Sequence, residues 1–416
     1  MPLRSDPSSD LPLDDAAREL YQSIVDGEHR AGDRGNVMFC VSTDELSDGR
    51  GDLFVALSLG RGLLAAGWGV SLWPTPRLVD ESPDDVDVAI VMIESFVPGM
   101  IRPRTKAIAW VRNWADHWAE LPYLDEFSQI WCSSEASAQR MRQCFDGPVH
   151  VVPIATDTEL FRPSDEDSRA PEIVATANFW GVERGLTAAL EHVAEQNPVT
   201  WFGANSRHLR LSGRIDHRDA VDYFSLPGIY SRWLVVVDDV IDSAARYGNQ
   251  NSRLFDALAC GAMVVTNTGN GLAELGLDEV PVYRDPEDLA RIVGELVADP
   301  AATRARAARL RDVVVAQHSA VARAELVRPL LETALAESVH PGRRSSLIRW
   351  VTLEREKRRE LEVERDEWRT RYFDVVDDYG RVRAELDDIR SSSSYRITRR
   401  VIVPVFGLAR RLVGRR

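Results

Sequence analysis

Short apolar runs alternate with longer amphipathic segments along most of the chain. From residue 36 onward the apolar runs have the length of buried strands, and the segments between them have the spacing of helices. Two successive rounds of strand and helix are typical of an α/β protein with two Rossmann-like parallel-sheet domains that face a cleft. We predict strands at 37–41, 70–73, 86–93, 107–111, 130–132 and 149–152, and again at 173–177, 199–202, 233–237, 263–266 and 280–283.

The same pattern divides the chain into parts. Residues 1–35 are polar and acidic, and we predict an N-terminal arm with one short helix around 14–25. The first α/β domain is predicted to span 36–156 and the second 157–340. A length of 416 residues is sufficient for two such domains and an appendage.

Beyond Pro341 the hydrophobic pattern changes to a heptad spacing within densely charged sequence. The gaps between apolar positions alternate between three and four once Arg365 is allowed as a polar break. We predict a helical appendage at 345–390 that pairs with a second copy as a coiled coil. One amphipathic helix folded back on the α/β domains is the alternative that this spacing leaves open. The apolar or aromatic positions are Leu361, Trp368, Tyr372, Val375, Tyr379, Val382, Leu386 and Ile389.

The last segment, 391–416, contains seven Arg and no acidic residue. From 395 to 416 apolar clusters alternate with arginine pairs, which suits an amphipathic segment on an anionic membrane surface. A solvated disordered end is the alternative. Binding of nucleic acid is not expected, because the whole chain carries a net charge of −14.

Composition limits the setting in which the chain works. The sequence has no run of about 18 uncharged apolar residues, so no membrane-spanning helix is expected. Its first 35 residues lack the basic start and apolar centre of a signal peptide. The four cysteines show no CxxC spacing, which argues against a zinc site and a disulfide framework. We therefore expect a cytoplasmic protein that attaches peripherally to the inner face of the cell membrane.

The segment 251–275, NSRLFDALACGAMVVTNTGNGLAEL, carries the most specific pattern in the chain. It predicts a helix that ends at Gly261, a buried strand and a glycine-rich turn, a unit that presents backbone N–H groups to a phosphate. The segment resembles the donor-binding core of GT-B glycosyltransferases, R-x-F-E-A-L-A-C-G-x-x-(V/L)-(V/L)-T-N. Asp256 stands where that family usually has Glu.

A second segment, 149–163, resembles the interdomain segment of retaining GT-B enzymes, V-x-P-x-G-x-D-x-x-x-F-x-P. Ala155 replaces the usual Gly, whereas the other fixed residues are retained as Pro153, Asp157, Phe161 and Pro163. The likeness extends over roughly 36–335 and is to the retaining family-four type, also called glycosyl transferases group 1. We interpret Asp157 as a turn cap rather than a catalyst.

The resemblance implies how a donor would be held by its ribose and sugar. Asp256 would accept hydrogen bonds from the ribose hydroxyls of a nucleoside diphosphate sugar. The first Glu of the family's E-x7-E signature is missing, and Gly248 lies at the matching distance. Contacts to the donor sugar would then come from Asn249, Asn251 or Ser252.

The resemblance also implies how the donor diphosphate would be held. Arg184 follows the first strand of the second domain, and Arg253 takes the place of the usual paired Lys. A guanidinium suits a phosphate because its fork matches two oxygens. Independently of the resemblance, the N–H groups of the glycine-rich turn formed by Asn270, Gly271 and Leu272 are candidates to face the donor, and a plain turn is the alternative.

In the first domain two loops at strand ends carry candidate chemistry. Gly49 and Gly51 precede a helix, and together they form a loop whose backbone can approach a diphosphate. Arg112, Asn113 and His117 follow the strand at 107–111 and are candidates for catalysis or substrate contact, because the carboxyl ends of parallel strands face the cleft. The tryptophans of this segment, Trp110, Trp114 and Trp118, suit a sugar-stacking wall, but we interpret Trp110 as a core residue.

The resemblance to GT-B enzymes implies a metal-independent hexosyltransferase of the retaining type. It would move a sugar from a nucleoside diphosphate donor to a glycan acceptor, lipid-linked in cell-surface polysaccharide biosynthesis, and it would need no cofactor. The sequence has no clear DxD motif for a metal-bound diphosphate. Two alternatives stay open: a degenerate GT-B scaffold that dimerises through its coiled coil, and a GT-B sugar-nucleotide epimerase. A dinucleotide oxidoreductase is not expected, since no GxGxxG follows the first strand.

Overall fold

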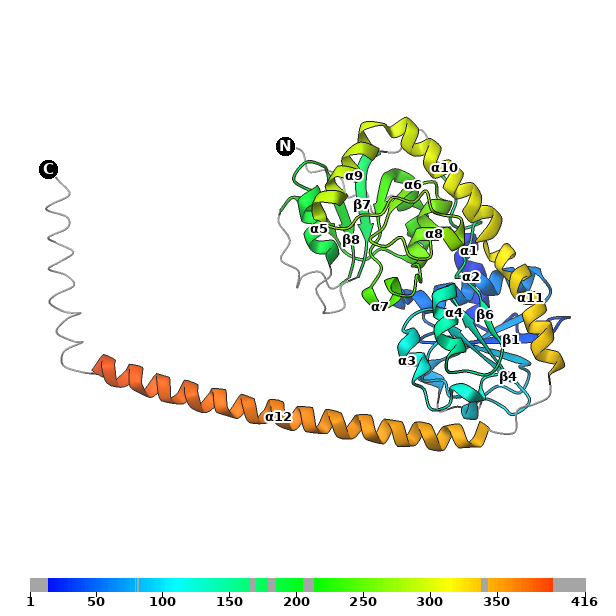
Figure 1. Cartoon of the computed structure of the whole chain (residues 1–416), viewed down its shortest axis with the longest axis horizontal. Coiled ribbons are helices and arrows are strands. Elements are labelled where there is room, and N and C mark those ends of the chain that lie inside the picture. The colour runs from blue at the N-terminus through cyan, green and yellow to red at the C-terminus, as the bar shows by residue number, and fades with distance from the viewer. Residues whose placement is uncertain are drawn as a thin grey trace. The chain divides into compact units, whose positions relative to one another are not determined.

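The computed structural model describes residues 14–78, 80, 82–164, 170–178, 185–204, 213–337 and 343–391, and Figure 1 shows the chain. The chain divides into two compact units, 1–349 and 350–416. Both sheets that the structure describes lie in the first unit, which agrees with the predicted α/β fold of two parallel-sheet domains. The domain boundaries given above stay predictions.

The first sheet has six parallel strands in the order β2-β1-β3-β4-β5-β6. Strands β1 to β5 are buried along nearly their whole length, as expected for strands of a covered parallel sheet. The six predicted apolar runs of the first half are confirmed as β1 (Asn36–Val41), β2 (Gly69–Pro74), β3 (Val88–Val91), β4 (Lys106–Val111), β5 (Gln129–Cys132) and β6 (Val149–Val151). The helices between them are α2 (Gly51–Ala65), α3 (Ala115–Ala119) and α4 (Glu135–Arg142).

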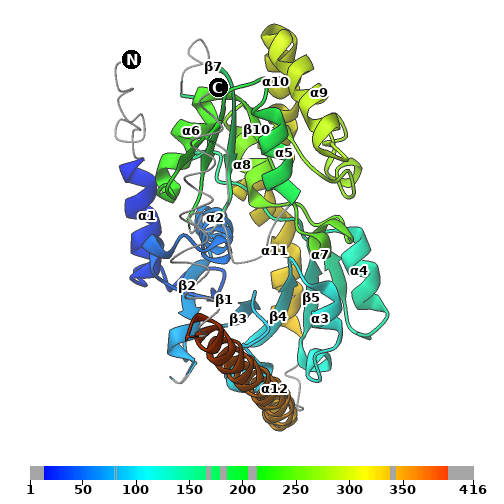
Figure 2. The same cartoon turned by 90° about the vertical axis from the view of Figure 1, so that its left-hand side faces the viewer.

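The second sheet has five parallel strands in the order β11-β10-β7-β8-β9. Its central strands are apolar and buried, and Figure 2 shows this sheet and the first in one view. The strands are β7 (Ala170–Thr176), β8 (Val199–Phe202), β9 (Ile215–Arg218), β10 (Trp233–Val237) and β11 (Met263–Val265). The helices are α5 (Gly185–Val193), α6 (Leu226–Arg232), α7 (Asp242–Ala245), α8 (Ser252–Ala259) and α9 (Pro286–Ala298).

Two features of the second sheet differ from the sequence prediction. Strand β9 was not predicted, because its sequence IDHR has a single buried residue and lacks an apolar run. The strand predicted at 280–283 is reduced to one bridge between Thr266 and Val282, since Pro281 has no N–H with which to extend a ladder. Short 3₁₀ helices connect other elements: η2 (Thr75–Arg77), η3 (Pro98–Met100), η4 (Leu124–Glu126) and η8 (Ala273–Leu275).

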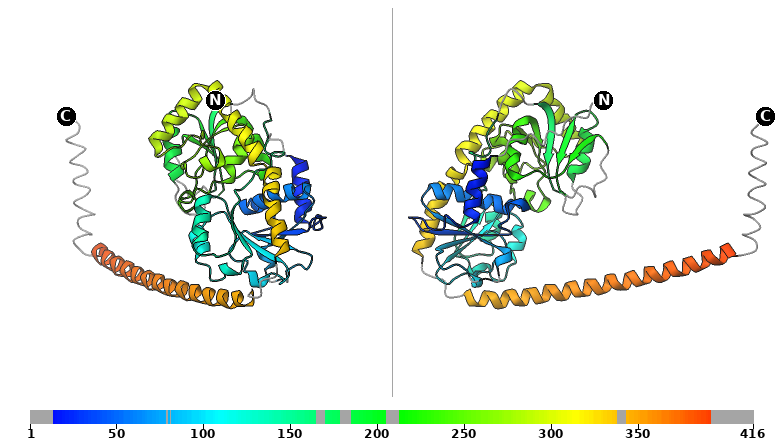
Figure 3. Two further views of the ribbon diagram at one scale, coloured as in Figure 1. Left: turned by 45° about the vertical axis from the view of Figure 1, so that its right-hand side comes forward. Right: turned by 180° about the vertical axis from the view of Figure 1, so that it is seen from behind.

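The chain returns from the second sheet to the first through α10 (Pro300–Gln317) and α11 (Ala320–Ala336), the yellow helices of Figure 3. At the return the backbone N–H of Thr156 donates to His318 at 2.9 Å, and that of Ala320 donates to Thr156 at 2.8 Å. Helix α11 then packs on α2, where a Cβ added to Gly62 would lie 2.2 Å from the carbonyl oxygen of Ala320. The two interdomain connections therefore run side by side and are joined by hydrogen bonds.

The N-terminal helix α1 (Asp15–Val25) confirms the helix predicted around 14–25 and braces these connections. Asp14 caps it by accepting from the N–H of Ala17 at 3.0 Å. The buried hydroxyl of Tyr21 donates to Asp157 at 3.0 Å, and Arg61 donates to the same carboxylate oxygen at 2.9 Å. Asp157 also accepts from the N–H of Glu159, which confirms its predicted role in a turn.

The appendage predicted at 345–390 lies within one helix, α12 (Arg343–Ser391). Four of its apolar side chains, spaced seven residues apart, are exposed: Leu361, Trp368, Val375 and Val382. The structure therefore confirms the helix, whereas the predicted coiled coil stays a prediction. The tail predicted to bind membrane, 395–416, lies outside the described residues. None of the helices in the described part of the chain has the length and hydropathy that crossing a membrane requires.

Candidate functional site

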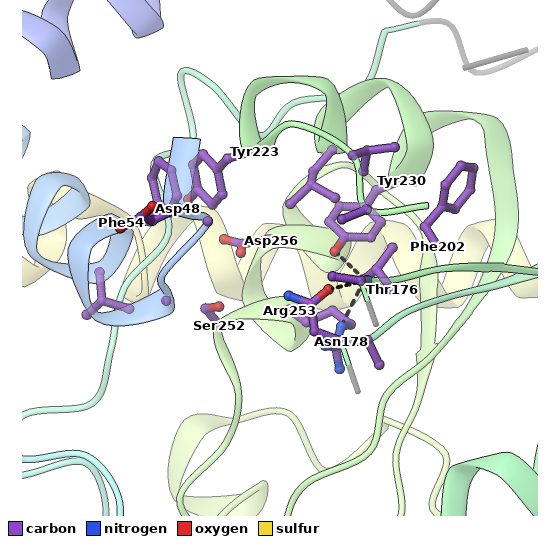
Figure 4. Close-up of a pocket in the computed structure, with 18 of the residues that line it drawn as sticks. Asp48, Phe54, Thr176, Asn178, Phe202, Tyr223, Tyr230, Ser252, Arg253 and Asp256 are labelled. Atoms are coloured by element: carbon purple, nitrogen blue, oxygen red, sulfur yellow. Dashed lines mark hydrogen bonds between the residues drawn. The ribbon is translucent and has the colours of Figure 1, made fainter. Parts of the chain in front are cut away.

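A cavity of about 440 Å³ lies where the first domain meets the second, and Figure 4 shows the side chains around it. Its first wall comes from the loop after β1 and the start of α2. Its second wall comes from the carboxyl ends of β7 and β8 and from the first turns of α8. The carboxyl end of a parallel sheet is where open α/β folds bind their ligands.

The first wall contains the two glycines that the sequence indicated. The 3₁₀ helix η1 (Leu46–Asp48) ends at Gly49 in the left-handed conformation, with φ 62°, and Gly51 begins α2. A Cβ at either glycine would meet nothing within 4 Å, so both face open space. Asp52 fixes this loop, because its carboxylate accepts from the N–H of Ser42 at 2.7 Å and from its hydroxyl at 2.8 Å. The amino end of a fifteen-residue helix thus points toward the cavity and favours negative charge.

The second wall contains three of the predicted donor contacts. Ser252, Arg253 and Asp256 all line the cavity, since positions three and four apart lie on one face of α8. The guanidinium of Arg253 donates to the hydroxyl of Thr176 at 2.9 Å and forms an ion pair with the fully buried Asp238. Burial is the largest single influence on the pKa of Arg253 and lowers it, but the charges of Asp238, Tyr230 and Asp239 and the hydrogen bond to Asp238 together raise it. Arg253 is therefore a fixed cation whose charge is largely balanced within the protein.

The carboxyl of Asp256 is the unusual group of this wall. It is 3% exposed and accepts from the hydroxyl of Thr156 at 2.6 Å. Burial raises the pKa of Asp256 to about 7, although the hydrogen bond from Thr156 and the charge of Arg253 oppose the rise. Near neutral pH this carboxyl exists in both protonation states, so a ligand that donates hydrogen bonds to it would favour the ionised form.

Aromatic rings and a strand end complete the cavity, and the sequence did not indicate them. Phe54 from α2 stacks on Tyr223 of η7 (Tyr223–Ser225), with centroids 3.6 Å apart and planes inclined by 8°. Tyr230 shares a hydrogen bond of 2.8 Å with Thr176 at the end of β7. Thr176 lies in the strand predicted at 173–177, and a position near the carboxyl end of a parallel strand is the one signal that the sequence offered for it. The stack joins residues far apart in the chain, so only the folded structure reveals it.

Two predicted donor contacts do not line this cavity. Asn249 is 1% exposed, and its side-chain oxygen accepts from the hydroxyls of Ser134 at 2.9 Å and Ser137 at 3.0 Å. It therefore connects the second domain to the start of α4. Asn251 donates to Asp238 at 3.1 Å and so belongs to the ion pair behind the cavity wall.

The glycine-rich turn also packs inside the second domain rather than along the cavity. A Cβ added to Gly271 would lie 2.2 Å from the carbonyl oxygen of Gly248, and Leu272 is buried. The side chain of Asn270 donates to the carbonyl of Ala245 at 3.0 Å. Gly248 itself has φ 70°, and its Cβ would lie 2.9 Å from the N of Gly271. The place of the missing family Glu therefore has no room for a side chain without a backbone shift.

The predicted catalytic residues lie at a neighbouring edge of the first sheet, after β4, and do not line the cavity. Arg112 donates to the carbonyl of Met92 at 3.3 Å; burial lowers its pKa, while the charges of Asp52 and Glu94 oppose this effect. His117 lies 3.7 Å from Glu94, and both side chains are partly exposed. Asn113, which follows Arg112 directly, is partly buried.

Arg184, the other predicted diphosphate contact, lies outside the described residues. The cavity therefore brings together five of the predicted residues, from both domains. These are Gly49, Gly51, Ser252, Arg253 and Asp256.

Comparison with known proteins supports the sequence resemblance. Residues 183–328 match the model of a family described as glycosyl transferase-like. A sucrose-phosphate synthase from Thermosynechococcus elongatus has 16% identity and a TM-score of 0.56, covering 73% of this chain and 100% of its own. HepE of Anabaena, solved in complex with UDP-glucose, has 14% identity and a TM-score of 0.55, covering 71% and 99%. AviGT4, a glycosyltransferase involved in avilamycin A biosynthesis, has 17% identity and a TM-score of 0.51, covering 73% and 98%.

No curated protein matches the chain in sequence. The family match covers most of the second domain, and the solved structures share the arrangement of both domains. The chain thus has the GT-B fold of these structures, with two parallel α/β sheets. The glycosyl transferase-like family match bears on its second sheet and the helices around it.

Proposed function

We propose that the chain transfers a sugar from a nucleoside diphosphate sugar to a glycan acceptor, and that the 440 Å³ cavity is the donor site. The observation that carries this proposal is the composition of the two walls. Ser252, Arg253 and Asp256 on α8 face the same cavity as Gly49 and Gly51 at the start of α2. The buried carboxyl of the second wall suits the ribose of such a donor, and the helix amino end of the first wall suits its diphosphate.

Asp256 is the proposed ribose contact. Its carboxyl already accepts hydrogen bonds from Thr156 and Ser252 and keeps further lone pairs for the ribose hydroxyls. Ribose hydroxyls are hydrogen-bond donors and would stabilise the ionised form of a group whose pKa is raised to about 7. The proposal therefore predicts that donor binding expels a proton from Asp256 at neutral pH.

The diphosphate is proposed to lie between the two helix amino ends. The backbone at Gly49 and Gly51 is open for close approach, and the dipoles of α2 and α8 favour negative charge there. Arg253 adds a guanidinium to the same cavity, held by Asp238. Groups fixed in this way would stabilise the departing diphosphate without reorganising, which is the usual source of such catalysis.

UDP-glucose is the first donor to test, because HepE was solved with it and shares the fold of this chain. We also propose, by the resemblance of the motifs, a hexosyltransferase with a retaining outcome that needs no metal. The lipid-linked acceptor, polysaccharide assembly and attachment at the cytoplasmic face of a membrane rest on the basic sequence of 395–416. Dimerisation through α12 is supported by the seven-residue spacing of its exposed apolar side chains.

The direct test is the melting temperature of the full chain with UDP, GDP, ADP and their sugars. A ligand at a hundred times its dissociation constant adds about 2.7 kcal/mol, a shift of a few degrees. We expect a selective shift that Asp256→Ala abolishes and Glu287→Gln, a change at an exposed carboxyl of α9, leaves intact. The absence of a shift with every nucleotide would reject the donor site.

A catalytically degenerate scaffold is the second candidate, and one observation favours it. The backbone around Gly248 excludes the side chain of the missing family Glu. Such a protein would bind the nucleotide sugar without turning it over. Release of UDP from UDP-glucose, measured with and without acceptor extracts, separates the two functions, because a scaffold releases none.

A further inference from the structure

Trp114 adopts a backbone conformation that its side chain disfavours. Among the residues that the structure describes, it is the only one other than glycine with a positive φ, at φ 58° and ψ 39°. It also occupies the N-cap of α3, where it makes no side-chain capping bond. Gly or Asn would relieve the left-handed backbone, and Asn, Asp or Ser would cap the helix. Local stability therefore does not explain a tryptophan here, and strain of this kind is typical of functional positions.

The Trp114 side chain is open to solvent although it is large and apolar. It is 54% exposed, whereas Trp110 and Trp118, on either side in the sequence, are buried. Burial of those two rings accounts for them as core residues. The left-handed backbone, rather than the exposure alone, marks this ring as a candidate contact surface for a ligand.

The position of Trp114 is the cleft edge of the first domain. Two residues further on, Asp116 accepts from the hydroxyl of Tyr247 at 2.5 Å and pairs with Arg246, both from the second domain. On the other side, the charge of Asp52, in the first turn of α2, acts on Arg112. The first turn of that helix also lines the donor cavity. Trp114 thus lies between an interdomain contact and the loop of the proposed donor site.

Polar groups accompany the exposed ring. His117 lies in α3, the short helix that begins directly after Trp114, and its Nε2 is 3.7 Å from the carboxylate of Glu94. The two side chains are 38% and 42% exposed, so each keeps hydrogen-bonding capacity toward solvent. A pyranose has an apolar C–H face and a rim of hydroxyls, which suit an exposed aromatic ring on the same segment as an imidazole that lies near a carboxylate.

We propose that Trp114, with Glu94 and His117, forms a platform for a pyranose ring of the acceptor. The ring would stack on Trp114, and its hydroxyls would donate to Glu94 and exchange hydrogen bonds with His117. This inference rests on the proposed transferase function for the identity of the ligand as acceptor. It adds to the proposed glycan acceptor the site on the first domain where one of its sugar rings would bind.

An array of defined glucan, galactan, mannan and rhamnan oligosaccharides tests the platform, with the full chain applied both alone and with UDP. We expect wild type to retain one or more of these sugars, and Trp114→Ala and Trp114→Asn to weaken retention by about tenfold. Trp114→Phe, which keeps an aromatic face, should retain most of the binding. Trp368→Ala, at an exposed tryptophan of α12, is the matched control and should bind as wild type.

Two outcomes would overturn the platform. One is equal retention of the sugars by wild type, Trp114→Ala and Trp114→Asn. The other is a wild type that binds none of the sugars while UDP still raises its melting temperature. The change in melting temperature with UDP is measured on every variant, so failure of the donor site is recorded separately. If the Trp114 variants lose sugar binding and UDP changes no melting temperature, the result supports the platform and rejects the donor proposal.

Discussion

The charged side chains at the two polar edges of the cleft differ in burial: those at the α8 wall are buried and paired, whereas those at the other edge are partly exposed. At the wall formed by α8, each charged group has a partner inside the protein: Arg253 pairs with Asp238, and Asp256 accepts from Thr156. At the edge formed by the segments after β3 and β4, Glu94 and His117 are partly exposed and the side chain of Trp114 is 54% exposed. The first arrangement suits an invariant ligand such as ribose diphosphate. The second suits a ligand that arrives from outside and varies.

The largest expected effect lies in the ion pair behind the α8 wall. Arg253→Met would leave the fully buried carboxylate of Asp238 without its cation, which should cost about 3–5 kcal/mol in the free energy of unfolding. Glu94→Gln, at the open edge, should cost less than about 0.5 kcal/mol. Urea unfolding of both variants measures the difference.

A double-mutant cycle is the control for this contrast. Arg253→Met combined with Asp238→Asn removes the stranded charge, so it should recover much of the stability that the single variant loses. If Arg253→Met alone unfolds at the same urea concentration as wild type, the wall is not held by this pair and the contrast between the two edges is lost.

The next effect concerns the missing family Glu. Gly248→Glu places a side chain on a left-handed backbone, with its Cβ 2.9 Å from the N of Gly271. We expect a loss of about 2–4 kcal/mol in stability and no gain in transfer activity. Gly248→Ala separates backbone strain from side-chain bulk. Thermal unfolding measures the stability of each variant, and UDP release measures its transfer activity. A Gly248→Glu protein that is as stable as wild type and more active would contradict the packing argument.

The pH dependence of the α8 wall is a smaller effect with a definite sign. Because burial raises the pKa of Asp256 to about 7, the folded protein holds this proton more tightly than the unfolded chain does. The resulting stabilisation is fully present below about pH 4, the unfolded pKa, and is lost as the pH rises through about 7. Asp256→Asn should flatten that part of the stability profile.

The same group sets the pH dependence of ligand binding. Ribose hydroxyls favour the ionised carboxyl, so UDP affinity of the wild type should rise several-fold between about pH 5.5 and pH 8. Calorimetric titration across this range, in wild type and Asp256→Asn, measures it. An affinity that falls with pH in the wild type, or a variant with the same slope, would remove Asp256 from the ribose site.

The smallest stability effect is expected at Trp114. Replacing it with Asn relieves left-handed strain of about 1–2 kcal/mol, which offsets the apolar burial that a half-exposed ring provides. The net change should lie within about 1 kcal/mol. Trp118→Asn, at a buried ring of the same segment, should cost about 3–5 kcal/mol. Equal losses in the two variants would show that Trp114 serves the core.

The fold was accessible from the sequence because its strands are continuous apolar runs. The runs at 37–41 and 233–237 are buried central strands, and hydrophobicity alone identifies such strands. Strand β9 was not predicted because it lies at the edge of the second sheet and has a single buried residue. Edge strands can be polar on their open side, so periodicity does not mark them.

The site was only partly accessible. Ser252, Arg253 and Asp256 were predicted because the segment 251–275 resembles a donor-binding motif, and the structure places them on one face of α8. The role of Asn249 was not visible, since its partners Ser134 and Ser137 come from the other domain. Contacts between distant segments depend on how the domains meet, which local patterns do not encode.

Hydrogen exchange of the full chain with and without UDP-glucose tests the central claim most directly. The proposed donor site predicts slower exchange in two separate segments, 47–54 at the start of α2 and 252–260 along α8, with α9 unchanged. Protection in only one of them would contradict a donor held between the two walls. Protection confined to other parts of the chain would place the nucleotide sugar outside this cavity and refute the account.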